Sequence, residues 1–177
     1  LMRTGYQKTL DAMPPALRAA LRDGNFSESV GEDDCQVIPT QWIMAAMRRW
    51  AREGKTGRAM TSMGVDIAQG GEDKTILAMR YGLWFTHIER PGRETPSGKE
   101  VAVLVVMNRR DNCPVVVDMG GGYGGDTKTR LTDNGIDVTP FNAGGSIAEK
   151  SRDGAKLNFF NKKAWMVWRM REALDPH

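Results

Sequence analysis

The chain has 177 residues with 25 Lys or Arg against 22 Asp or Glu, and this formal net charge of +3 permits contact with nucleic acid without requiring it. Its two histidines and two widely separated cysteines leave little from which to build a zinc site or a histidine-based catalytic triad. Because no apolar run approaches the ~20 residues that cross a bilayer and the start lacks a secretory pattern, we expect a soluble, intracellular protein that avoids membranes.

The first third of the chain is predicted to be a helical linker segment over 1–62. A short helix is expected at Ala16–Arg22, and Thr40 is a candidate cap for a second helix. Five apolar residues of this second helix fall on one face, which predicts core packing: Trp42, Ile43, Ala46, Met47 and Trp50. The tripeptide Gly54–Thr56 resembles the end of a nucleotide-binding loop, but the preceding glycine and strand that such a loop needs are missing. We therefore interpret it as linker.

From Met63 onward the pattern predicts an α/β domain over 63–177. The stretch around Val101 is ambiguous, because its β-branched residues favour a strand whereas Ser97 and Glu100 form a capping box that favours a helix. We predict the helix, which makes the following strand parallel to its neighbour in the sheet. The expected elements are a strand from 63, strands at 75–81 and 83–89, a helix at 101–107, a strand at 115–118, a helix ending at 133, a strand at 136–141 and a helix at 158–174.

Two of these strands end in the same way, with an aspartate followed by glycines. Asp66 and Asp118 each close an apolar run, although aspartate is disfavoured in strands and a buried carboxylate is costly without a partner. One interpretation is that the two acids meet and hold a divalent metal ion for phosphodiester chemistry. The other is that each caps its own turn, since Asp before Gly commonly ends a strand. Asp73, in the turn after the first strand, is interpreted as a turn residue.

The residues around these acids resemble the nuclease half of tailed-phage terminase large subunits. The resemblance is carried by Gly64–Ala68, Gly70–Thr75 and Val116–Gly124. Further similar stretches are 5–26, 37–42, 161–165 and 174–176. The resemblance implies an RNase H-like fold, with three antiparallel strands followed by parallel strands and flanking helices. It also implies a metal-dependent endonuclease that cuts concatemeric viral DNA at the start and end of capsid filling.

The same resemblance implies roles for individual acids. Asp66 corresponds to the acid on the first strand and is expected to bridge two Mg²⁺ or Mn²⁺ ions, while Asp118 corresponds to the acid on the fourth strand and binds one ion. The family has a third acid, commonly in a Ser-Pro-Asp context, and this sequence lacks that segment. Asp126 and Asp153 are weak substitutes. We therefore expect that the nuclease domain is incomplete at its C-terminal end and that this fragment can lack nuclease activity.

DNA contact is expected from glycines and basic residues near the predicted site. The main candidates are Gly121, Gly122, Lys128, Arg130, Lys156, Lys162 and Lys163, and a wider basic set adds Arg48, Arg49, Lys55, Arg58 and Lys150. The resemblance implies double-stranded viral DNA, an upstream ATPase domain, the portal protein and the small terminase subunit as partners, in the host cytoplasm. Two alternatives stay open: an actin-like ATPase fragment, and a DNA-binding or docking module that has lost nuclease activity.

Overall fold

The computed structural model describes residues 36–54, 57–149 and 157–175. The helix expected at 16–22 lies outside these residues, as do Lys55, Lys150, Asp153 and Lys156. The described elements are α3 (Thr40–Glu53), β1 (Ser62–Asp66), β2 (Lys74–Tyr81), β3 (Trp84–Pro91), the short helix η1 (Gly92–Glu94), α4 (Gly98–Asn108), β4 (Val115–Asp118), η2 (Gly120–Gly122), α5 (Gly124–Asp133), β5 (Val138–Phe141) and α6 (Lys162–Leu174). None of the helices in these ranges has the length and apolar character that a membrane span would need.

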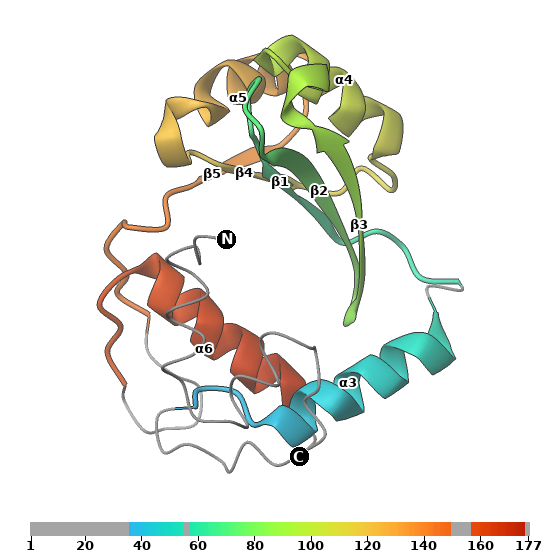
Figure 1. Cartoon of the computed structure of the whole chain (residues 1–177), viewed down its shortest axis with the longest axis vertical. Coiled ribbons are helices and arrows are strands. Elements are labelled where there is room, and N and C mark those ends of the chain that lie inside the picture. The colour runs from blue at the N-terminus through green and yellow to red at the C-terminus, as the bar shows by residue number, and fades with distance from the viewer. Residues whose placement is uncertain (1–35, 55–56, 150–156, 176–177) are drawn as a thin grey trace, which may run out of the picture.

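The strands form one mixed sheet in the order β3-β2-β1-β4-β5 (Figure 1). β1 pairs antiparallel with β2, and β2 with β3, whereas β1 with β4 and β4 with β5 are parallel. The predicted RNase H-like arrangement of three antiparallel strands followed by parallel strands is therefore confirmed. The proposed boundary between a linker at 1–62 and a domain at 63–177 stays a prediction.

Helix α4 forms where the sequence pattern was ambiguous, because two reciprocal hydrogen bonds cap its N-terminus. The Ser97 hydroxyl accepts a hydrogen bond from the Lys99 N–H at 3.2 Å, and the Glu100 carboxylate accepts one from the Ser97 N–H at 3.1 Å. The hydrogen bond from the Ser97 side chain also lowers the pKa of Glu100. The capping box thus outweighs the strand preference of the valines that follow, and the predicted helix is confirmed.

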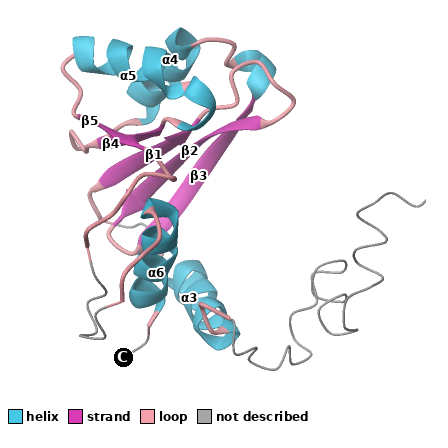
Figure 2. Ribbon diagram, turned by 90° about the vertical axis from the view of Figure 1, so that its left-hand side faces the viewer, coloured by secondary structure: helices cyan, strands magenta, loops and turns pink. Residues whose placement is uncertain are grey.

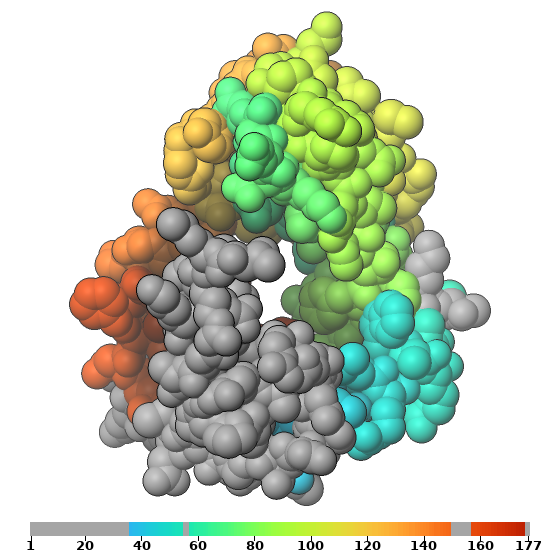
Figure 3. All heavy atoms as spheres, in the orientation of Figure 1, coloured from blue at the N-terminus to red at the C-terminus, as the bar shows by residue number. Residues whose placement is uncertain are grey.

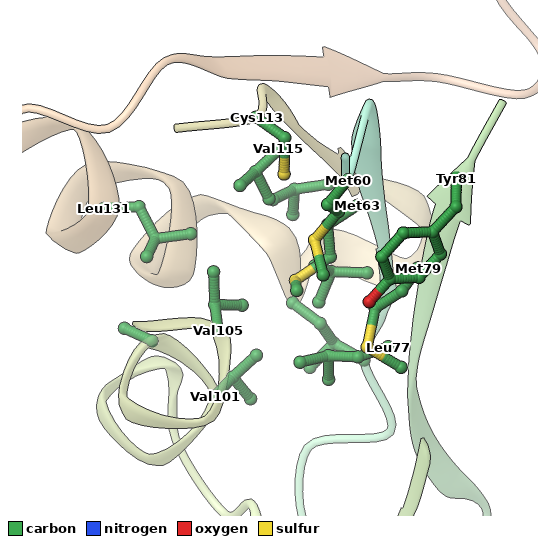
Figure 4. Packing of buried hydrophobic residues seen from close by; sticks show 14 residues of the cluster. Met60, Met63, Leu77, Met79, Tyr81, Val101, Val105, Cys113, Val115 and Leu131 are labelled. Atoms are coloured by element: carbon green, nitrogen blue, oxygen red, sulfur yellow. The ribbon is translucent and has the colours of Figure 1, made fainter. Parts of the chain in front are cut away.

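Helices α4 and α5 cover one face of the sheet and close the hydrophobic core against it (Figure 2). Side chains from both helices point at alternate residues of the central strands (Figure 4). The fully buried hydrophobic residues are Met63, Leu77, Val101, Val105, Val115, Val117 and Leu131. This layer stabilises the sheet. The strand residues that alternate with the buried ones face the opposite side of the sheet.

Helices α3 and α6 lie on the opposite side of the sheet and contact each other (Figures 1 and 2). Arg171 of α6 stacks over the Trp42 ring at 4.8 Å and donates to the Val37 carbonyl at 2.8 Å. Trp50 of α3 stacks on Trp84 of β3, with ring centroids 5.6 Å apart and nearly parallel planes. Each indole also donates a hydrogen bond to backbone next to the other ring, Trp50 to Phe85 and Trp84 to Trp50. These contacts attach α3 to the end of the β2–β3 hairpin.

Three predictions for these outer helices are wrong. Thr40 does not cap α3, because its hydroxyl instead accepts a hydrogen bond from the Gln36 amide and Pro39 precedes the first turn. The apolar face of α3 does not enter the core, since Met47 is 61% exposed and no residue of α3 is buried. Helix α6 begins at Lys162 instead of residue 158, because the Asn161 side chain accepts a hydrogen bond from the Ala164 N–H at 2.9 Å and caps it there.

Candidate functional site

The register of β1 and β4 places the two candidate acids side by side. Val65 pairs with Val117 in this parallel ladder, and the next residue on each strand is the aspartate, so Asp66 and Asp118 share a row. Adjacent strands lie about 4.8 Å apart. Because Val65 and Val117 point into the core, both aspartates point to the sheet face that α4 and α5 leave open. The register thus puts both residues in one row on this face, while the convergence of their carboxylates on a metal ion stays a prediction.

The two carboxylates differ in their local bonding. Asp118 accepts a hydrogen bond from the Gly120 N–H at 2.9 Å through Oδ1, so one of its oxygens caps the following turn. The carboxylate of Asp66 is exposed and has no hydrogen-bond or ion-pair partner within the described ranges. The turn-capping interpretation therefore accounts for one oxygen of Asp118 and for none of Asp66.

The glycines after Asp118 are required by the backbone. Gly121 and Gly122 have φ values of 64° and 83°, a region that residues with a Cβ rarely adopt. At Gly124 a Cβ would lie 2.4 Å from the Asp118 carbonyl oxygen, so glycine is needed for α5 to start directly against β4. The loop thus holds Asp118 at the point where strand and helix meet. Whether Gly121 and Gly122 also contact DNA stays a prediction.

An open hollow of about 500 Å³ lies beside Asp66. It is formed by the end of β1, the β1–β2 turn and the start of β2, and its lining residues are Asp66, Ile67, Ala68, Glu72, Asp73, Lys74 and Ile76. No pattern in the sequence indicates that Glu72 and Lys74 lie beside Asp66, because their position depends on how the turn folds. Thr75 orders this turn, since its buried hydroxyl accepts a hydrogen bond from the Ala68 N–H at 3.1 Å and pairs with the Thr95 hydroxyl at 2.7 Å.

A third acid beside Asp66 and Asp118 is not provided by Asp126. Asp126 lies in α5 on the covered side of the sheet, where it pairs with Arg130 at 2.9 Å and packs against Gly98. Within the parts of the chain that the structure describes, no three His, Cys, Asp or Glu side chains are grouped so as to hold a metal ion. Asp153, the other weak substitute, lies outside the described residues.

The basic residues predicted to contact DNA divide between two places. Lys128 and Arg130 belong to α5, across the sheet from the aspartates. Lys162 and Lys163 begin α6, where their backbone N–H groups donate to Gly145 and Ala143 in the loop after β5. Lys162 and Lys163 are thus tied to the segment that follows the strand beside Asp118, while the DNA-binding role of all four residues stays a prediction.

Comparison with known proteins identifies the fold. No protein-family model matches the sequence, and no curated protein matches it significantly. Among solved structures, a mutant of gp2c of the large terminase subunit from bacteriophage Sf6, with calcium, aligns at a TM-score of 0.55 and 19% identity over 78% of this chain. The nuclease domain of the large terminase subunit gp2 of bacterial virus Sf6 aligns at a TM-score of 0.55 and 18% identity over 78% of this chain. In both cases the alignment spans 65% of the solved chain. The chain therefore has the fold of a terminase large-subunit nuclease domain.

Proposed function

We propose that this chain is the endonuclease domain of a viral DNA-packaging terminase and that it hydrolyses DNA phosphodiesters with Asp66 and Asp118. The observation that carries the proposal is the placement of the two carboxylates in one row of adjacent parallel strands, on the sheet face that the helical layer leaves open. The fold likeness to terminase nuclease domains supports the reaction class. In this proposal the substrate is concatemeric double-stranded viral DNA, cut when packaging begins and ends.

The donor set at this site fits a hard divalent cation. Two carboxylates on a shared face offer the oxygen ligands that Mg²⁺ and Mn²⁺ prefer, and the free carboxylate of Asp66 can serve two ions at once. One of the terminase neighbours was solved with calcium, a cation of the same kind. When bound, a pair of such ions supplies Lewis acidity and a reactive hydroxide for in-line attack on phosphorus.

The chain's own contribution is to hold the carboxylates in fixed directions. Asp66 ends β1, which is hydrogen-bonded on both sides within the sheet, so its backbone has little freedom. The bond from the Gly120 N–H fixes one oxygen of Asp118 and leaves its Oδ2 for another ligand. The two acids differ accordingly: Asp66 has both oxygens available, whereas Asp118 has one.

The expected partners and cellular location in this proposal are those that the resemblance to terminases implies. An upstream ATPase domain, the portal protein and the small terminase subunit are the expected partners, in the host cytoplasm. Lys162 and Lys163, whose backbone N–H groups bond to the loop after β5, are among the phosphate contacts in this proposal. Sequence-tolerant phosphate contact predicts that DNA affinity falls steeply as salt concentration rises.

The test is Mn²⁺ binding and plasmid nicking by the intact protein and its Asp66→Asn variant. We expect Mn²⁺ to raise the melting temperature of the wild-type protein and to support nicking, and we expect the variant to lose both responses. Asp133→Asn, which changes an exposed acid of α5 on the other side of the sheet, is the matched control and should behave as wild type. Wild-type nicking by Asp66→Asn would refute the assignment.

A non-catalytic DNA-binding or docking module is the second candidate. It is favoured because, among the described residues, no three His, Cys, Asp or Glu side chains are grouped so as to hold a metal ion. Salt-dependent DNA binding without Mn²⁺ binding or nicking would establish it. The actin-like ATPase is not favoured, because the structural neighbours are terminase nuclease domains; a melting-temperature increase with ATP would revive it.

A further inference from the structure

One positively charged side chain, Lys74, lines the hollow beside Asp66, and it has no role in the reaction proposed above. Of the seven residues that line the hollow, Lys74 alone is positively charged. Asp66 pairs with Ile76 across the β1–β2 ladder, and Lys74 lies two residues from Ile76 on the same face of β2. At about 3.4 Å per residue this is a separation that the four-carbon stem of lysine can cross.

The backbone around Lys74 is held more firmly than an ordinary turn. The Asp73 carbonyl accepts a hydrogen bond from the Gly92 N–H at 2.9 Å, and the Gly70 N–H donates to the Gly92 carbonyl at 3.0 Å. A Cβ at Gly92 would lie only 2.5 Å from the Gly71 carbonyl oxygen, so the turn and the residues after β3 are in close contact. Figure 3 shows this turn at the surface, next to the stretch that leads into α4. The base of the Lys74 side chain is therefore preorganised.

The Lys74 side chain is held at the edge of the hollow by an acid. Its Nζ pairs with the Glu89 carboxylate on β3, whose other oxygen lies 3.3 Å from the His87 imidazole. The hydrogen bond from Lys74 lowers the pKa of Glu89, so this acid is ionised at neutral pH. The Lys74 side chain remains 60% exposed. An exposed pair of this kind contributes little to stability, so stability alone does not explain the lysine.

We propose that Lys74 is a substrate-binding residue of the Asp66 site, and that its ammonium group contacts a DNA phosphate lying over the hollow. This inference rests on the proposed nuclease function. A lysine donates to phosphate oxygens as a compact point charge, so the contact favours the DNA backbone regardless of sequence. Glu89 keeps the ammonium in place before DNA arrives, and DNA phosphate competes with Glu89 for it.

If Lys74 and Glu89 served only as a structural ion pair, Lys74→Gln and Glu89→Gln would have the same effect on activity. If Lys74 binds phosphate, the two variants differ. We expect Lys74→Gln to lower kcat/KM for Mn²⁺-dependent nicking about 10- to 100-fold, as for the loss of a charge-assisted hydrogen bond. We expect Lys74→Arg to keep most of the activity. Glu89→Gln should bind DNA at least as tightly as wild type, because it releases the ammonium for phosphate.

DNA affinity measured against salt concentration, without metal, gives a readout independent of cleavage. Lys74→Gln should reduce the slope of log K against log salt by about 0.9, the loss of one phosphate contact. Lys99→Gln is the matched control, because Lys99 is an exposed lysine of α4 on the covered side of the sheet, and its slope should stay at the wild-type value. Melting temperatures confirm that each variant is folded.

Two results would overturn the inference. One is wild-type nicking and a wild-type salt slope for Lys74→Gln; the other is a loss in Glu89→Gln equal to that in Lys74→Gln, which would show that only the ion pair matters. If the wild-type protein binds DNA but does not nick it, the nuclease proposal fails by itself, and the salt slope still decides the role of Lys74.

Discussion

The two faces of the sheet carry residues of opposite kinds. On the covered face, Val65, Leu77 and Val117 are almost fully buried under α4 and α5. On the open face, the residues next to them along the strands include Asp66 and Asp118, which are exposed or half-buried. Because side chains alternate along a strand, a shift of one residue separates a side chain that stabilises the fold from one available for chemistry. Stability and function should therefore respond to different substitutions, even on one strand.

The largest expected effect contrasts two neighbours on β4. Asp118→Asn should lower Mn²⁺-dependent nicking at least about 100-fold, since changes merely next to a metal ligand already cost 10- to 100-fold, and it should leave stability nearly unchanged. Val117→Ala should lower the free energy of unfolding by about 2 kcal/mol through lost burial, with normal nicking per folded molecule. Activity assays and urea unfolding measure the two effects. If both variants lose both properties, the faces are not separable.

The next effect compares Leu77 with Ile76 on β2. Leu77 has no exposed surface, so Leu77→Ala should cost about 2–5 kcal/mol of unfolding free energy. Ile76 is only half-buried on the open face, and Ile76→Ala should cost less than half as much. Denaturant unfolding of both variants measures the difference. Equal losses would mean that the open face is packed as tightly as the core in solution.

A smaller effect tests the contact between α4 and α5. At Gly98 a Cβ would lie 2.5 Å from both the Asp126 carboxylate and the Thr127 backbone nitrogen, and the backbone contact cannot be relieved by a rotamer change. Gly98→Ala should therefore destabilise the protein by about 1–3 kcal/mol. Gly125→Ala in α5 is the control, because a Cβ there meets nothing within 4 Å and should be neutral or stabilising. Comparable losses in both variants would argue against close packing at Gly98.

The smallest effect concerns the cap of α4 and its dependence on pH. Ser97→Ala should cost about 1 kcal/mol at pH 7. Because the Ser97 hydrogen bond lowers the Glu100 pKa below 4.5, its contribution is present above pH 4.5 and disappears as the pH falls through the folded-state pKa. The stability difference between wild type and variant should thus shrink on acidification, as urea unfolding at several pH values would show. A difference that grows at low pH would contradict this linkage.

Local sequence signals predicted much of the fold. The alternating runs on either side of Gly82 gave the antiparallel strands, and the pair of Ser97 and Glu100 identified α4 in spite of its valines. The same helix made the strand after it parallel to its neighbour, as β4 is to β1. Each of these inferences depended on contacts within a few residues, or on the handedness of one crossover.

The rest depended on contacts between distant segments. The apolar face of α3 gave no sign that Trp50 would stack on Trp84 outside the core, because periodicity shows that a face needs a partner but not which partner. The hollow beside Asp66 and the position of Lys74 follow from the close approach of Gly92 to the β1–β2 turn. A side chain that makes a helix begin later than predicted, as Asn161 does at the start of α6, is likewise recognised only once its hydrogen bond is known.

The paired indoles of Trp50 and Trp84 also give the molecule an optical signature. Two aromatic transitions held this close together couple to each other, and we expect adjacent circular-dichroism bands of opposite sign wherever the two transition dipoles are not parallel. Detachment of α3 from the hairpin would abolish that doublet without melting any helix or strand. Movement of this segment, on DNA binding for example, can therefore be followed in solution with no added label.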